Sequence, residues 1–291
     1  MKISLLNGGL GNQVFQYIFA RFGERYCPGE PWYLDDSFFF TENVHNGYEL
    51  EKVFGIKANL LSNYFEQDVW NEIIRLQKEE KLSMPQIFLN MGLPVVVVKE
   101  SEDVDFKGAV VKTEMNGFYP EIIKLPYENL YYHGYWINGD WFYHYREQMM
   151  EELRFPELKD EKNRKYAGQI QNSFSVGIHI RRGDFVTIGW DMPPEYYENA
   201  CKNVIAENSE AIFFVVSDDI EWCRENEKKL GLNLAKDTIY ISGNIDGKNY
   251  IDMQLLSMCR GMIMSNSSFC YLAALMDYNL ELVVNPTARK V

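Results

Sequence analysis

The chain has 291 residues, of which 46% are hydrophobic and 24% are charged, and this ordinary globular composition excludes wholesale disorder. Its 29 basic and 42 acidic side chains give a formal net charge of −13, so bulk binding to a nucleic-acid backbone is disfavoured. At about 150 residues per domain, the length predicts two domains.

The first part of the chain opens with the pattern of an α/β unit. Residues 2–6 are predicted as a strand, 7–12 as a glycine-rich loop and 13–26 as a helix. The elements predicted after them are strands over 31–34, 95–99 and 131–136, and helices over 64–82 and 141–153. The charged, apolar-poor stretch 157–165 is predicted as a linker, so the first domain covers residues 1–156.

The second domain, residues 166–291, alternates strands and helices more clearly. Strands are expected over 173–180, 211–216, 238–242, 261–264 and 280–284, and helices over 195–208, 250–259 and 269–277. Polar loops are expected over 181–194 and 265–268. Strands that alternate with helices predict a parallel sheet covered on both faces. The predicted fold class is therefore α/β, with two Rossmann-like domains that face each other across a cleft.

The glycine-rich loop lies beyond the carboxyl end of a strand, where doubly wound sheets bind ligands. Gly9 and Gly11 lack a Cβ atom and let a ligand approach the backbone, and the helix that follows favours anions at its start. The dinucleotide fingerprint needs a third glycine where Val14 stands, although Asp35 lies about where a ribose-binding acid would. A tight turn without a ligand is the alternative.

The sharpest string runs from His179 to Asp184 and places Arg181 and Arg182 directly after a buried strand. Adjacent side chains on extended backbone point oppositely, so one arginine can face the cleft while the other anchors the loop. The guanidinium fork suits phosphate or carboxylate, so this pair predicts a diphosphate pocket to which His179 could donate. A structural pair of arginine with Asp184 is the alternative for the arginines, and a satisfied core group is the alternative for His179.

A second anion cradle is predicted at residues 265–269, where hydroxyls and backbone N–H groups meet at the start of a helix. Ordinary capping explains one of its three serines. Asp252 lies on the preceding helix, and its carboxylate can accept both the N1–H and the N2–H of guanine. A solvated helix acid is the alternative.

Metal and membrane signals are weak. Asp103 and Asp105 spell the DxD string of metal-dependent glycosyltransferases, but a solvated acidic loop explains it better, and no zinc or P-loop string occurs.

The five cysteines form no CxxC pair, which favours reduced thiols. Without a secretory signal or a long apolar run, we expect a cytoplasmic protein.

Four motifs, taken in order, resemble the bacterial-type α-1,2-fucosyltransferases of glycosyltransferase family eleven: GGLGNQVFQY at 8–17, HIRRGD at 179–184, SDDIEWC at 217–223 and SNSSF at 265–269. Smaller echoes at 48–54 and 134–136 extend the resemblance over nearly the whole chain. The α-1,6- and protein O-fucosyltransferases share the HxRR loop and are more distant. The resemblance implies a two-domain GT-B-type fold, GDP-fucose as donor, no required metal or other cofactor, and inversion at the anomeric carbon.

The resemblance also implies roles for the motif residues. A loop arginine holds the diphosphate, and the acid at Asp252 reads guanine. Asp184 is the first candidate for a general base, although the neighbouring arginines should lower its pKa and weaken it. The expected catalytic residues are Arg181, Asp184 and Asn12; the expected donor-binding residues are Gly9, Gly11, Gln13, His179, Arg182, Ser217, Asp218, Asp252, Ser265, Asn266, Ser267, Ser268 and Phe269.

The implied reaction transfers L-fucose to the 2-hydroxyl of a terminal galactose-type residue on a glycan acceptor. Relatives commonly read GYWQ followed by Glu-Lys, whereas residues 134–136 are followed here by Ile137-Asn138-Gly139-Asp140, so acceptor preference is not carried over. A non-catalytic sugar-nucleotide binder and an NAD-type oxidoreductase are the alternatives. Peripheral association with the inner face of the membrane and the oligomeric state stay open.

Overall fold

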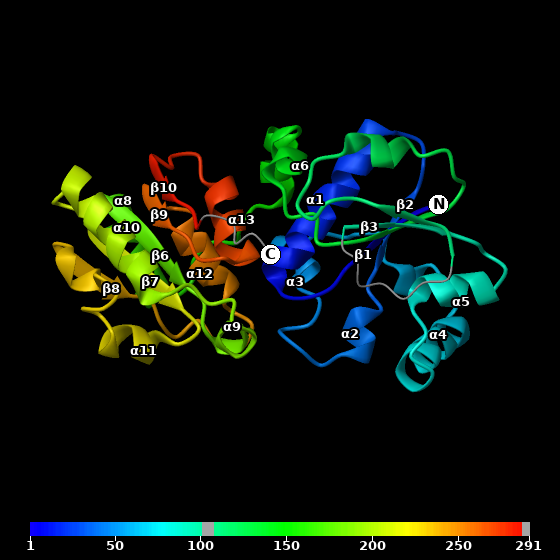
Figure 1. Ribbon diagram of the computed structural model, residues 1–291, viewed down its shortest axis with the longest axis horizontal. Helices are drawn as coiled ribbons and strands as arrows, with labels where there is room; N and C mark the ends of the chain where they lie inside the picture. Colours follow the sequence, from blue (N-terminus) through cyan, green and yellow to red (C-terminus); the bar gives the residue numbers. More distant parts are fainter. Residues whose placement is uncertain (101–107, 287–291) are drawn as a thin grey trace. The chain divides into compact units, whose positions relative to one another are not determined.

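The computed structural model describes residues 1–100 and 108–286 and is drawn in Figure 1. The chain divides into two compact units, Met1–Phe155 and Pro156–Val291. Each unit is built on one five-stranded sheet whose paired strands all run parallel. The prediction of two Rossmann-like α/β domains is confirmed.

Unit 1 has the strand order β2-β1-β5-β3-β4, so β1 pairs with β5 although more than a hundred residues separate them. Its strands are β1 (Lys2–Leu5), β2 (Trp32–Asp35), β3 (Val96–Lys99), β4 (Val110–Lys112) and β5 (Leu130–His133). Its helices are α1 (Leu10–Tyr26), α2 (Phe38–Thr41), α3 (Leu50–Phe54), α4 (Gln67–Glu79), α5 (Met84–Asn90), α6 (Gly139–Tyr143) and α7 (Arg146–Glu152), with short 3-10 turns at Leu61–Asn63 and Pro120–Lys124.

Aromatic packing fixes α1 against the sheet of unit 1. Phe19 stacks on Trp136 with ring centroids 4.2 Å apart and meets Trp32 edge-on at 5.9 Å. Gly23 gives Trp32 its room, since a Cβ at that position would lie 2.0 Å from the Trp32 ring. This packing fixes the middle and second half of α1, and the helix begins at Leu10, just beyond the carboxyl end of β1 at Leu5.

Three of the elements predicted in unit 1 differ in the structure, and β4, α2, α3 and α5 were not predicted. The strand expected over 131–136 ends at His133, because the backbone of the next residues turns to donate hydrogen bonds to Glu100. The helix expected over 141–153 is broken into α6 and α7. The helix expected over 64–82 is shorter and spans Gln67–Glu79.

Unit 2 has the strand order β10-β9-β6-β7-β8, with the first strand of the unit at the centre. Its strands are β6 (Ser175–Ile180), β7 (Ile212–Ser217), β8 (Asp237–Tyr240), β9 (Gly261–Ile263) and β10 (Leu282–Val284). Its helices are α8 (Glu161–Gln171), α9 (Gly183–Ile188), α10 (Pro194–Glu207), α11 (Ile220–Glu225), α12 (Tyr250–Leu256) and α13 (Ser268–Met276), with a 3-10 turn at Leu232–Leu234. The segment 181–194, expected as a loop, thus contains the short helix α9.

The segment 157–165, predicted as a linker, contains the start of α8. Asp160 caps this helix by accepting a hydrogen bond from the Asn163 N–H at 2.8 Å. Asn163, Ala167 and Ile170 form the buried face of α8. The charged residues that suggested a linker lie outside this face, as in an amphipathic helix. Unit 2 therefore begins at Pro156. Across the described residues, no helix is long and apolar enough to cross a bilayer.

One carboxylate joins α7 to α1 in unit 1. Glu152 accepts hydrogen bonds from Tyr17 Oη at 2.7 Å and from Arg21 Nε and Nη2 at 2.9 and 2.8 Å, and it also pairs with Arg25. Burial opposes ionisation of this carboxyl, but the hydrogen bonds from Arg21, Tyr17 and Arg25 outweigh it and lower the pKa of Glu152 to about 2.

We predict that Glu152→Gln lowers the free energy of unfolding of the protein at pH 7 by about 2 kcal/mol, because charge-assisted hydrogen bonds are lost. A lowered carboxyl pKa gives stability that is present above the unfolded-state pKa near 4.5 and is lost as the pH falls toward 2. Urea unfolding at pH 7 and pH 3 measures both effects. Glu151→Gln is the control, and equal stability of the two variants at pH 7 would refute the role of Glu152.

Candidate functional site

The carboxyl edge of the unit 2 sheet gathers the motifs of the second domain. From the central strand β6 the chain passes to β7 and β8 on one side, and later to β9 and β10 on the other, so the order reverses between β6 and β9. Open α/β sheets bind ligands at such a point. The segments that leave β6, β7 and β9 begin with Arg181, Asp218 and Met264, which brings three of the predicted loops to one edge.

Arg181 is held by two carboxylates at this edge. Its Nη2 lies 2.6 Å from Asp184 Oδ1 and its Nη1 lies 2.9 Å from Asp218 Oδ2. Its guanidinium also lies over the Phe185 ring at 5.4 Å, and about three tenths of the side chain is exposed. Arg181 is therefore a charged, partly exposed fork, aligned by its neighbours.

Arg182 anchors the loop. Its guanidinium lies 3.5 Å from the centre of the Trp222 ring, and its Nε lies 3.3 Å from Asp219 Oδ2. Asp219 also caps α11 by accepting the Trp222 N–H. Of the two arginines predicted to hold a donor, the structure thus ties Arg182 to the protein itself and leaves Arg181 the more exposed.

Asp218 and Ser217 support this loop. Asp218 Oδ1 accepts the backbone N–H of Arg182 at 2.8 Å, while its Oδ2 pairs with Arg181. Ser217 Oγ accepts the N–H of Asp219 at 3.0 Å. Gly183 is required beside them, because its φ is +20° and a Cβ would lie 2.6 Å from Asp218 Oδ2. Both predicted donor-binding side chains are therefore engaged in positioning the arginines.

His179 lies at the reversal point between β6 and β9. Its Nδ1 is 2.7 Å from Ser265 Oγ, and its ring stacks on Phe269 with centroids 5.3 Å apart. Burial, aided by the positive charge of Arg181, lowers the pKa of His179 to about 3. The imidazole is therefore neutral at pH 7, and it can offer one N–H donor without adding charge.

The 265–269 segment divides its polar groups between two tasks. Ser265 is buried, and its hydroxyl bonds His179 and lies 3.7 Å from Cys270 Sγ. Ser267 caps α13 by accepting the Phe269 N–H. Asn266 is exposed and Ser268 half-buried at the start of that helix. Asn266 is thus the exposed residue of the predicted anion cradle, and Ser267, Ser268 and Phe269 are half-buried.

Asp252 ends a chain of buried amides. Its Oδ1 accepts Asn244 Nδ2 at 2.6 Å, and Asn244 and Asn163 exchange two hydrogen bonds, at 2.8 and 3.1 Å. Burial raises the pKa of Asp252 to about 6, against the hydrogen bond from Asn244 and the charge of Lys162, which lower it. Since α12 connects β8 to β9, its first turn lies toward the carboxyl edge, where the other motifs meet.

The glycine loop of unit 1 does not match every expectation. Gln13 is fully buried; its Nε2 donates to the carbonyls of Gly8 and Gly47, both at 2.9 Å, and its Oε1 accepts the Glu49 N–H at 2.9 Å. In this structure Gln13 joins two loops, and its contact with the donor stays a prediction. Gly11 is buried in the first turn of α1, whereas Gly9 and Asn12 are half-buried.

Asp35 does not fit a ribose-binding acid. Its carboxylate is fully buried, accepts the Tyr131 hydroxyl at 2.6 Å and accepts the Ser37 N–H at 3.0 Å. Burial raises its pKa. This removes the acid on which the NAD-type interpretation of the glycine loop depended.

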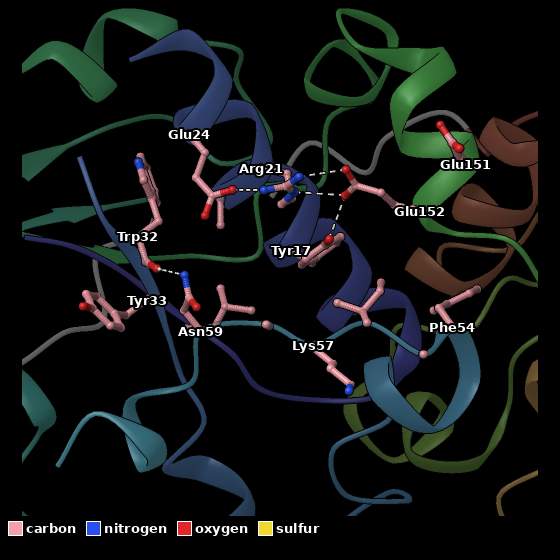
Figure 2. A pocket seen from close by; sticks show the side chains of 15 residues that line it. Tyr17, Arg21, Glu24, Trp32, Tyr33, Phe54, Lys57, Asn59, Glu151 and Glu152 are labelled. Carbon is pink, nitrogen blue, oxygen red and sulfur yellow. Dashed lines mark hydrogen bonds and ion pairs between the residues drawn. The ribbon is translucent and has the colours of Figure 1, made fainter. Parts of the chain in front are cut away.

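A cavity of about 490 Å³ lies in unit 1 between the second half of α1, β2, residues 54–59 and α7. Figure 2 shows Arg21 between Glu24 and Glu152, and Tyr17 pointing to Glu152. None of the predicted site residues lines it.

Sequence reasoning missed several polar residues that build the loops. Gln16, Glu100, Asn163 and Asn244 are buried and hydrogen-bonded to loops or to site residues. The available signal was a polar residue inside an otherwise apolar element, as at Gln16 within the helix of Phe15 and Phe19. His45 was also missed; it is exposed, and its Nδ1 would lie 3.6 Å from a Cβ at Gly9.

Among the residues that the structure describes, no group of three or more His, Cys, Asp or Glu side chains could hold a metal ion. Asp103 and Asp105, the DxD string, lie outside the described residues. The absence of a metal requirement stays a prediction.

Comparison with known proteins gives relatives across the chain. An alpha-1,2-colitosyltransferase from Escherichia coli is 28% identical over 98% of this chain and 91% of its own length. Galactoside alpha-(1,2)-fucosyltransferase 2 from Gorilla gorilla gorilla is 28% identical over 52% of this chain and 46% of its own. A crystal structure of POFUT1 in complex with GDP, 11% identical, covers 97% of both chains with a TM-score of 0.51, and it shares the GT-B-type fold.

The family model described as glycosyl transferase family 11 matches residues 3–288. The match includes every motif discussed above, in both units. The chain belongs to glycosyl transferase family 11, as its motifs predicted, and is therefore a glycosyltransferase.

Proposed function

We propose that this enzyme transfers L-fucose from GDP-fucose to the 2-hydroxyl of a terminal galactose-type residue on a glycan, with inversion at the anomeric carbon and without a metal. The observation that carries the proposal is Arg181 at the strand-order reversal of unit 2, beside a neutral histidine, in a family that includes α-1,2-fucosyltransferases. In this proposal unit 2 binds the donor and unit 1 the acceptor.

The charge that develops on the leaving GDP sets the task of the site. As the bond from fucose to the diphosphate breaks, positive charge grows on the sugar and negative charge on the diphosphate. A fixed donor aimed at such a charge contributes about 3–4 kcal/mol to transition-state stabilisation. Arg181 supplies this donor, and Asp218 fixes its direction. His179, neutral and held by Ser265, adds a hydrogen bond without repelling Arg181.

Asp184 is the proposed general base for the acceptor hydroxyl, and its ion pair with Arg181 makes the role conditional on the donor. In the ligand-free protein, Asp184 Oδ1 is held by Arg181 Nη2 at 2.6 Å. When a diphosphate takes over Arg181, the carboxylate is released to accept a proton. Asn12, at the start of α1, is proposed to orient the fucose or the acceptor.

Two alternative functions make different predictions. A sugar-nucleotide binder without turnover would bind GDP-fucose and transfer nothing. An NAD-type oxidoreductase is disfavoured by the burial of Asp35. We propose a cytoplasmic location, and the inner face of the membrane is a further place where the enzyme could meet a lipid-linked glycan.

We predict metal-free binding and transfer. In excess EDTA, calorimetric titration should give micromolar dissociation constants for GDP and GDP-fucose and no binding of NAD. Incubation with lactose should then yield a product whose new linkage at the 2-hydroxyl, and whose anomeric configuration, are read by NMR. Transfer that requires added manganese would refute metal independence, and binding of NAD alone would refute the donor class.

We predict that Arg181→Ala lowers kcat for transfer by about 10²–10³-fold, because the charge that faces the diphosphate is removed. Arg260→Ala is a matched control, since Arg260 forms an exposed pair with Glu281 at the opposite, amino end of the unit 2 sheet. Circular dichroism should report an intact fold for both. Near-normal turnover of the Arg181 variant would eliminate its role.

We predict that Asp252→Asn weakens GDP-fucose binding about tenfold or more at pH 8, since a hydrogen bond to a charged group is worth about 1.5–3 kcal/mol. With a pKa of about 6 in the free protein, Asp252 becomes protonated as the pH falls through 6, so the wild-type affinity should fall there while that of the variant stays flat. The titration uses GDP-fucose as the ligand and not GDP, because the diphosphate diester of GDP-fucose does not change its charge in this pH range.

The control for this experiment is Asp237→Asn, which lies at the amino end of β8. A wild-type affinity that does not change between pH 8 and pH 5, or an unchanged dissociation constant for Asp252→Asn, would remove the guanine contact.

A further inference from the structure

A buried carboxylate shapes the loop that follows β5. Glu100, the residue after β3, is 4% exposed, and it accepts the N–H groups of Asn116 at 3.1 Å and of Tyr135 and Trp136 at 2.7 Å each. Burial raises its pKa against these three hydrogen bonds. Burying a carboxylate is costly, so the two N–H groups of this loop and the one from the segment after β4 that satisfy Glu100 mark it as the organiser of the loop after β5.

The loop itself is strained. Trp136 has a φ of +56°, a left-handed backbone that a large aromatic residue rarely adopts and that costs about 1–3 kcal/mol. Its ring stays buried, stacked on Phe19, while the N–H bond to Glu100 holds the backbone. Gly134 cannot be replaced without a shift, because a Cβ there would lie 2.6 Å from Glu100 Oε2. Such strain is kept where a loop geometry serves a function.

A second buried side chain ties this loop to the glycine loop. Gln16 Nε2 donates to the Gly134 carbonyl at 3.0 Å and to Asn7 Oδ1 at 2.8 Å, and Gln16 Oε1 accepts the Asn7 N–H at 2.9 Å. Asn7 and Gly134 follow the carboxyl ends of the neighbouring strands β1 and β5. Two buried polar residues thus join both loops at the edge where parallel sheets bind ligands.

The loop held by Glu100 and Gln16 exposes the side chain of Tyr135 to solvent. Tyr135 is 41% exposed, although its N–H is fixed by Glu100 and both its neighbours in the loop are restrained. In the part of the chain that the structure describes, its ring and hydroxyl have no hydrogen-bond or ring partner. A core role does not explain an exposed ring on a costly, rigid loop, whereas an aromatic face with a polar tip suits the apolar face and hydroxyls of a sugar.

We propose that Tyr135 is the stacking ring for the terminal galactose-type sugar of the acceptor, and that Glu100 is the positioning residue that presents it. The inference rests on the proposed function for the identity of that sugar. Tyr135 contacts the acceptor, whereas Glu100 acts only through the loop backbone.

The test separates acceptor from donor kinetics. Tyr135→Ala should raise KM for lactose about tenfold, with little change in KM for GDP-fucose or in the slow hydrolysis of GDP-fucose without acceptor. Tyr135→Phe and Tyr135→Trp should restore most of the acceptor affinity, since both keep a ring. The matched control is Tyr127→Ala, an equally exposed tyrosine of unit 1. An acceptor KM that does not change in Tyr135→Ala would overturn the proposal while the function stood.

Glu100→Gln tests the positioning role, because the isosteric amide replaces one acceptor atom by a donor that faces loop N–H groups. Its acceptor KM should rise as in Tyr135→Ala, and Tyr135→Ala should add little in the double variant. An unchanged acceptor KM, or an equal rise in both KM values, would refute positioning through this loop.

Saturation-transfer NMR of lactose on the wild-type and Tyr135→Ala proteins distinguishes the failure of this inference from the failure of the proposed function. Loss of the lactose signal only in the variant would support the stacking ring even if the wild type transferred nothing. Equal signals in both proteins would overturn it whatever the enzyme transferred.

Discussion

Polar side chains that satisfy the backbone of surface loops are the constraint on which both candidate sites depend. A buried N–H without a partner costs as much as a lost hydrogen bond, so a loop that curls at a sheet edge needs an acceptor. In unit 1 the buried side chains of Glu100 and Gln13 meet this need, and each binds groups from two segments of the chain. In unit 2 the carboxylate of the exposed residue Asp218 accepts the Arg182 N–H and pairs with the Arg181 guanidinium. These bonds hold the loops in one geometry, so the exposed residues on them are placed in advance of any ligand.

The same constraint explains how an acidic chain can hold an anion site. Arg181 is neutralised in the ligand-free protein by Asp184 and Asp218, and His179 carries no charge. In the proposed function, the diphosphate competes with the exposed carboxylate of Asp184 for Arg181, while Asp218 stays bound to the backbone of Arg182. This competition lowers the affinity for the diphosphate, but the direction of Arg181 is already fixed, and preorganised charge is what stabilises a transition state.

The sequence predicted the sheets and the motif loops because both depend on local patterns. Apolar runs such as 175–180 mark buried strands, and polar residues directly after them mark the carboxyl edge. Three features depended on contacts distant in the chain and were not predicted. Gln13 stands in a motif but bonds Gly47 and Glu49, Glu100 bonds residues about 35 positions away, and β5 stops at His133 because of that carboxylate. Spacing alone cannot separate a motif residue that contacts a ligand from one that holds the loop.

The residues of the motif 179–184 also divide into those proposed to contact a ligand and those that hold the loop. Arg181 is partly exposed and His179 is buried and held by Ser265, whereas Arg182 is held between Asp219 and Trp222 and Gly183 leaves the space that Asp218 needs. In the proposed function, replacing Gly183 acts on the donor through Arg181, since a Cβ at this position would displace the Asp218 carboxylate that aims Arg181. The string of six residues from 179 to 184 thus contains a partly exposed charge, a neutral imidazole and the residues that align them, and in the proposed function only some of the six contact the substrate.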